Sequence, residues 1–164
     1  MFQPKPLSRE GIDAALEKAD RYRFLGEPWE SDSICRDVLA IEPDNQRALI
    51  ALISAIAQQL GEGTGGDMGE ARSLVRRLSG AYERAFYSGV IIERYAKEML
   101  AHGTLGVGPA VYELFTEAMA CYEEAEQIRP SGDDSSILRW NTCVRVIERN
   151  KLKPPPGPPT GRRY

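Results

Sequence analysis

The sequence is poor in the residues that mark exported and metal-binding proteins. Its three cysteines, Cys35, Cys121 and Cys143, lie far apart, and His102 is its only histidine. An odd, scattered set of cysteines predicts reduced thiols, and the start lacks the apolar stretch of a secretory signal, so we expect a cytoplasmic protein. A zinc site needs three or four nitrogen or sulfur ligands, and no cluster of histidine and cysteine supplies them. We therefore expect neither a metal nor another cofactor.

Long apolar runs and an excess of basic residues are also missing. The longest apolar-rich stretch, 48–57, is broken by Ser54 and is too short to cross a bilayer. The net charge is −3, whereas a protein that binds nucleic acid without sequence preference normally presents a basic face. The expected partner is therefore neither a membrane nor a nucleic acid.

The 164 residues are of ordinary globular composition, with 42% apolar and 27% charged residues, which suits one domain with a buried core. Apolar residues recur at three- and four-residue spacing, and no segment alternates β-branched with polar residues over the length of a strand. We therefore predict an all-α fold of about seven helices. The expected ranges are 8–25, 28–41, 43–60, 69–78, 80–102, 110–129 and 134–150.

Several residues mark the ends of these helices. Ser8 is expected to cap the first helix, Gly26 to end it in the left-handed conformation, and Pro28 to open the second. The third helix is apolar almost all round, so it should be central and buried on several sides. The five glycines of 61–69 predict a flexible loop.

The chain is expected to divide into an N-terminal arm, 1–7, a helical domain, 8–150, and a proline-rich disordered tail, 151–164. The tail contains the spacing P-x-x-P at 155–158 and at 156–159, beside Arg162 and Arg163. A polyproline-binding partner could use these sites. The alternative is a tail that only adds solubility.

Three features resemble catalytic motifs, and each has a simpler interpretation. The glycines of 61–66 fit G-x-G-x-x-G by letter but follow an apolar helix rather than a strand, which favours a plain connection. His102, with Glu98 one turn before it, is expected to sit at a helix end, where the helix dipole favours it. The cysteines fall among apolar residues on helix faces and are expected to pack as small hydrophobes. We therefore expect a protein that is not an enzyme.

A pattern recurs on two of the predicted helices. Ser31, Cys35 and Val38 precede Pro43 at the same offsets at which Ala118, Tyr122 and Ala125 precede Pro130. The pattern resembles the second helix of the tetratricopeptide repeat, in which small, aromatic and small residues precede a proline. The resemblance covers roughly 11–150 and implies a right-handed α-solenoid of antiparallel helix pairs, with about three repeats and a closing helix. Its middle part departs from the pattern, so 61–108 is either a repeat or an insertion.

The resemblance also implies a concave groove that binds a peptide or helix of a partner protein. The residues that it assigns to this groove are Leu16, Asp20, Arg23, Phe24, Arg47, Ile50, Ser54, Gln58, Phe86, Val90, Glu93, Arg94, Asn141 and Arg145. The family's carboxylate clamp is not expected, because Leu16 and Asp20 occupy its slots. The expected function is a non-catalytic interaction module or scaffold. The alternatives are a chaperone for a secreted or unstable client, a self-associating structural subunit such as a homodimer, and a groove face whose charges only contact solvent.

Overall fold

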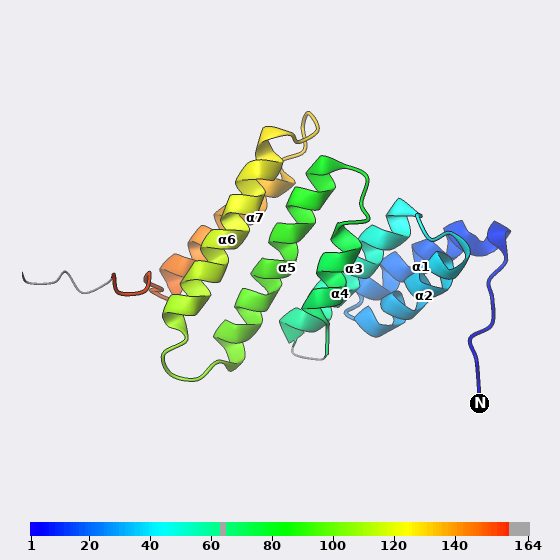
Figure 1. Cartoon of the computed structure of the whole chain (residues 1–164), viewed down its shortest axis with the longest axis horizontal. Coiled ribbons are helices and arrows are strands. Elements are labelled where there is room, and N and C mark those ends of the chain that lie inside the picture. The colour runs from blue at the N-terminus through cyan, green and yellow to red at the C-terminus, as the bar shows by residue number, and fades with distance from the viewer. Residues whose placement is uncertain (63–64, 158–164) are drawn as a thin grey trace, which may run out of the picture.

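The computed structural model describes residues 1–62 and 65–157, and all the regular structure in this part of the chain is helical (Figure 1). The prediction of an all-α fold is confirmed. The α-helices are α1 (Ile12–Phe24), α2 (Pro28–Ile41), α3 (Gln46–Glu62), α4 (Met68–Val75), α5 (Ala81–His102), α6 (Gly108–Gln127) and α7 (Ser135–Arg149).

The first two connections follow the sequence signals. Gly26 has a φ of +78° between α1 and α2, a conformation that glycine adopts without the strain of a Cβ atom. Pro28 is the first residue of α2, where its missing N–H costs no hydrogen bond. Asn45 opens α3, because its side-chain oxygen accepts a hydrogen bond of 2.9 Å from the Ala48 amide.

Other helix ends differ from the prediction. The Ser8 side chain forms no capping hydrogen bond, and the chain enters α1 through a short 3-10 turn, Arg9–Gly11. Helix α3 continues to Glu62, since the intrinsic cost of a helical glycine, about 1 kcal/mol, is small beside the burial of a long apolar helix. Helix α4 begins earlier than expected because Asp67 caps it, accepting hydrogen bonds of 2.7 and 3.2 Å from the amides of Gly69 and Glu70.

The helices follow one another as neighbours in a row (Figure 1). Helix α1 packs on α2, α2 on α3, α5 on α6, and α6 on α7, while α3 also contacts α1, α4 and α5. The expectation of a central α3 is therefore confirmed, and Leu49, Leu52, Ile53 and Ile56 are each at most 2% exposed. One consequence is that α1, α3 and α5 lie next to one another along one side of the row.

Near each end of the described chain, an apolar side chain packs against the helical domain. Leu7 of the arm packs against a cluster of Ile12, Leu16, Val38 and Ala48. Leu152 packs against the core that α5, α6 and α7 share.

Two sequence expectations fall partly outside the described residues. Residues 152–157 have no regular secondary structure. The rest of the predicted tail, with the ends of both P-x-x-P sites and the two arginines, and the middle of the predicted glycine loop lie outside the described residues. Within residues 1–62 and 65–157, no helix has both the length and the apolar character that crossing a bilayer requires.

Candidate functional site

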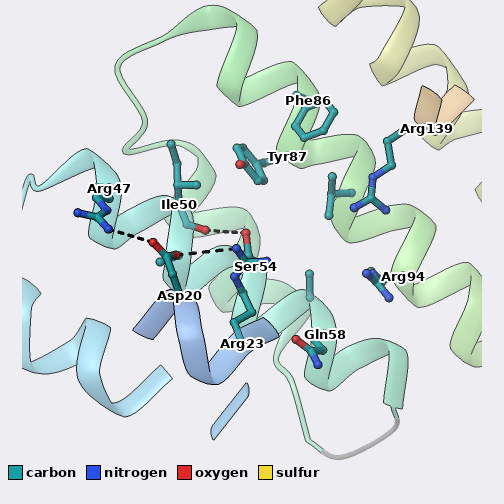
Figure 2. Close-up of a pocket in the computed structure, with 13 residues that line it drawn as sticks. Asp20, Arg23, Arg47, Ile50, Ser54, Gln58, Phe86, Tyr87, Arg94 and Arg139 are labelled. Carbon is teal, nitrogen blue, oxygen red and sulfur yellow. Dashed lines mark hydrogen bonds and ion pairs between the residues drawn. The ribbon is translucent and has the colours of Figure 1, made fainter. Parts of the chain in front are cut away.

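A hollow of about 350 Å³ lies where α1, α3 and α5 meet, with α7 at one end (Figure 2). We call it the central groove. Its lining residues are Asp20, Arg23, Arg47, Ile50, Ala51, Ser54, Ala57, Gln58, Phe86, Tyr87, Val90, Arg94 and Arg139.

Helical periodicity explains why these residues share one surface. Along α3, Arg47, Ile50, Ser54 and Gln58 are three or four residues apart, so their side chains form a single stripe. Phe86, Val90 and Arg94 form the facing stripe on α5. The floor between them includes Ala51 and Ala57, whose small buried side chains leave the hollow open.

At the α1 side of the groove, one carboxylate serves two arginines. Asp20 accepts a hydrogen bond of 3.0 Å from Arg47 and lies 3.8 Å from an Nη atom of Arg23. The Arg23 guanidinium also lies 4.7 Å from the centre of the Phe24 ring, and among the described residues its buried Nε has no hydrogen-bond partner. This end of the groove therefore carries one positive charge more than Asp20 compensates.

At the α7 side, a buried carboxylate holds Arg139 in place. Glu93 of α5 is fully buried and accepts a 2.5 Å hydrogen bond from the hydroxyl of Tyr122 on α6. Arg139 donates to both of its oxygens at 3.3 Å, and Lys97 donates to one of them. Burial raises the pKa of Glu93, but the hydrogen bonds from Lys97 and Tyr122 and the charge of Arg139 outweigh burial and lower this pKa below its ordinary value. Glu93 is therefore ionised, and it too serves two cations.

Arg94 differs from the other arginines of the groove. Its side chain is half-buried and enters the hollow from α5, on the side opposite Asp20 (Figure 2). No ion pair or hydrogen bond joins it to another described residue. A guanidinium stays charged at any physiological pH, so Arg94 presents an uncompensated cation to the groove.

The structure brings together nine of the residues that the sequence assigned to the groove. These are Asp20, Arg23, Arg47, Ile50, Ser54, Gln58, Phe86, Val90 and Arg94.

Five other predicted groove residues lie outside its lining. Leu16 is 2% exposed, because its apolar side chain turns toward α2 and packs with Val38. Phe24 ends α1 and is 78% exposed. Glu93 is covered by α6 and α7, whose side chains bond its carboxylate. Asn141 and Arg145 lie farther along α7, which reaches the groove only through Arg139.

Sequence reasoning missed four residues of the lining, namely Ala51, Ala57, Tyr87 and Arg139. The two alanines follow from the stripe on α3 and could have been found from its periodicity. Arg139 could not, because its place depends on how α7 rotates against α5, and the repeat pattern assigns a different side of α7 to the groove.

The cysteines do not line the groove, and burial makes the thiols of Cys35 and Cys143 unreactive. All three are free thiols, and Cys35 and Cys143 are buried. Burial raises the pKa of each of these two thiols to about 12, and burial also raises the pKa of Cys121. A thiol with so high a pKa is neutral at physiological pH and is a poor nucleophile. In the described part of the chain, no three His, Cys, Asp or Glu side chains gather as metal ligands would.

No protein-family model, no curated protein sequence and no solved structure matches this chain.

Proposed function

We propose that this protein is a non-catalytic interaction module that binds a segment of another protein in the central groove. The observation that carries the proposal is the groove itself, which combines an apolar floor with arginines from α1, α3, α5 and α7. Interfaces of this kind bind through buried apolar contacts, while arginines pair with carboxylates and peptide carbonyls. The groove is lined by helices that pack on one another, so a partner would meet a preformed surface.

The chemistry of the groove favours binding over catalysis. Its charged side chains are four arginines, which donate hydrogen bonds but accept none, and Asp20, which is already bonded to Arg47. The neutral thiols of Cys35 and Cys143 are buried in the core and do not line the groove. Three free thiols also support our proposal that the protein acts in the reducing cytoplasm.

A tetratricopeptide-like arrangement is part of the proposal. The six small, apolar or aromatic residues of the recurring pattern, on α2 and α6, are all fully buried. They are Ser31, Cys35, Val38, Ala118, Tyr122 and Ala125. The neighbouring positions of α1, α3 and α5, the first helices of the proposed pairs, also support a solenoid whose inner side is the central groove.

Site-specific photocrosslinking tests the proposal. A photoreactive amino acid replaces Gln58 at the groove in one variant and the exposed Glu126 of α6 in the other, and both are irradiated in native cell extract. We expect a partner protein to be crosslinked from position 58 and not from position 126. Crosslinks from position 126 alone would place the interaction on the outer side of the helices and contradict the proposal.

Self-association is a second candidate, because three large apolar side chains are exposed around the α1–α2 turn. Phe24, Leu25 and Trp29 are 78%, 66% and 57% exposed. The apolar face of α3, by contrast, is buried inside the protein and cannot form such an interface. Light scattering over a range of concentrations, with Trp29→Ser as the comparison, tests this candidate. A monomer at every concentration would eliminate it.

A further inference from the structure

The central groove is more positive than the protein that carries it. The whole chain has a net charge of −3, yet four arginines and one aspartate line the groove. Two carboxylates form ion pairs with these arginines, and each of them pairs with two cations. Asp20 pairs with Arg23 and Arg47, and Glu93 pairs with Arg139 and Lys97. Arg94 has no carboxylate partner among the described residues. One positive charge therefore remains uncompensated around Asp20, one around Glu93 and one at Arg94.

The position of these cations favours a ligand that brings its own carboxylates. Arg94 and Arg139 point into the same half of the groove, opposite Asp20 (Figure 2). Arg139 is fixed there by two contacts of 3.3 Å to the buried Glu93, so little side-chain freedom would be lost when a second anion binds it. A carboxylate of a bound segment can pair with guanidinium groups that are only partly hydrated, which strengthens the interaction.

A second hollow continues the groove past Arg139. It is lined by Phe86, Ser135, Leu138, Arg139 and Thr142, so it shares Phe86 and Arg139 with the central groove. Leu138 is 64% exposed at its edge, and the Phe86 ring stacks on Tyr82 with the ring centres 5.7 Å apart. An apolar side chain seated between Leu138 and the face of Phe86 would remove both from water.

We propose that the segment bound in the central groove is acidic and carries an apolar side chain, with its carboxylates at Arg94 and Arg139 and its apolar side chain in the hollow beside Phe86 and Leu138. This inference rests on the proposed function and specifies the partner. The carboxylates of the bound segment can be those of Asp or Glu side chains, so a free C-terminus is not required. A nucleic acid also carries negative charge, but the four arginines of the groove lie in one hollow of an acidic protein, whereas a nucleic-acid site extends along a backbone.

Selection from a peptide library tests the inference. Phage-displayed random peptides of about 12 residues, which span about 40 Å when extended, are selected on the wild-type protein. They are counter-selected on Ser54→Trp, which fills the groove without changing its charge. If Ser54→Trp does not keep the wild-type circular dichroism and melting temperature, Gln58→Trp at the same stripe replaces it.

The outcomes of the selection distinguish a failure of this inference from a failure of the proposed function. Enrichment of sequences rich in Asp and Glu, with a recurrent apolar residue, is the expected result. Since the protein is itself acidic, nonspecific attraction would enrich basic peptides instead. Enrichment of neutral or basic sequences would overturn the inference and leave the proposed function intact. If no sequence prefers the wild type over the filled variant, the proposed function fails as well.

Binding of an enriched peptide then tests the assigned residues. We expect Arg94→Gln and Arg139→Gln to weaken it by about tenfold to a hundredfold, the range for hydrogen bonds between charged groups. The control Arg145→Gln, on α7 but outside the lining, should change the affinity by less than about twofold. Leu138→Ser should lower the affinity for the enriched peptide. It should not lower the affinity for a version of that peptide in which the apolar residue is replaced by Ala. Equal affinities for all these variants would overturn the assignment.

A nucleic-acid ligand is tested in the same assay. A fluorescein-labelled random single-stranded RNA of similar length is titrated against the wild type and Arg94→Gln. We expect binding much weaker than that of the enriched peptide. RNA that binds more tightly than the peptide, and loses affinity with Arg94→Gln, would overturn the inference in favour of a nucleic acid.

Discussion

Replacing the buried Glu93 tests how the ionic centre beside the groove contributes to stability. Glu93→Gln preserves the shape of the side chain and removes its charge. The carboxylate accepts hydrogen bonds from the Tyr122 hydroxyl at 2.5 Å, from Arg139 at 3.3 Å and from Lys97. Since Lys97 and Arg139 each keep 31% of their side-chain surface exposed, water can hydrate both after the substitution.

The magnitude follows from these contacts. Removing one partner of a fully buried ion pair costs about 3–5 kcal/mol, and hydrogen bonds to a charged group contribute about 1.5–3 kcal/mol. Because both cations are partly exposed, we expect Glu93→Gln to lower the free energy of unfolding at pH 7 by about 2–3 kcal/mol. For a domain of this size, that corresponds to a fall in Tm of about 4–12 °C.

The pH dependence provides an independent test. The pKa of Glu93 is lowered in the folded protein, so its contribution is fully present above its ordinary value of 4.5. That contribution is lost as the pH falls through the lowered folded-state pKa. The stability difference between wild type and Glu93→Gln should therefore be constant near neutral pH and shrink in acid.

Urea unfolding at several pH values measures both quantities, with Glu126→Gln as a control on the exposed surface of α6. We expect the control to match the wild type within about 0.5 kcal/mol. Equal stability of Glu93→Gln and wild type at pH 7 would refute the reasoning, since it would mean that the cost of burying the charge cancels its interactions. A difference that grows as the pH falls would refute the sign of the linkage.

Three further predictions concern the packing around the groove. Gly89→Ala would place a methyl group 2.7 Å from the Tyr122 ring. The cost of overpacking, about 1–3 kcal/mol, should exceed the gain of about 1 kcal/mol in helix propensity and lower the Tm, so a raised Tm would contradict this prediction. Arg36 of α2 pairs with Asp32 of the same helix at 2.5 Å and links α2 to α4 through Glu70 at 2.6 Å. We expect Arg36→Gln to lower the free energy of unfolding by about 1 kcal/mol at low salt and by less at high salt, whereas a loss independent of salt would indicate packing instead. Burial and raised pKa values should keep the thiols of Cys35 and Cys143 unmodified by iodoacetamide at pH 8, while Cys121, the more exposed thiol, reacts first. If mass spectrometry finds Cys35 modified as fast as Cys121, the prediction that Cys35 is buried in the core is wrong.

Local sequence signals were sufficient for most of the helical framework. The apolar periodicity predicted each α-helix in the described residues, because a helix buries a stripe whose spacing is set by its own geometry. Gly26 and Pro28 predicted the turn between α1 and α2 through backbone constraints that belong to single residues. The apolar surface of α3 predicted its central position. Nine of the residues on these stripes line the central groove.

Tertiary packing alone decided the rest, because it depends on neighbours that are distant in the sequence. Glu93 looks like an exposed groove residue in the sequence, but Tyr122 and Arg139, from two later helices, enclose it and keep it charged. The rotation of α7 brings Arg139 rather than Asn141 or Arg145 to the groove. The sequence by itself therefore determined which segments are helices and which stripe each one buries. The packing of α6 on α5 and of α7 on α6 determined which positive charges of the groove remain without a carboxylate of their own.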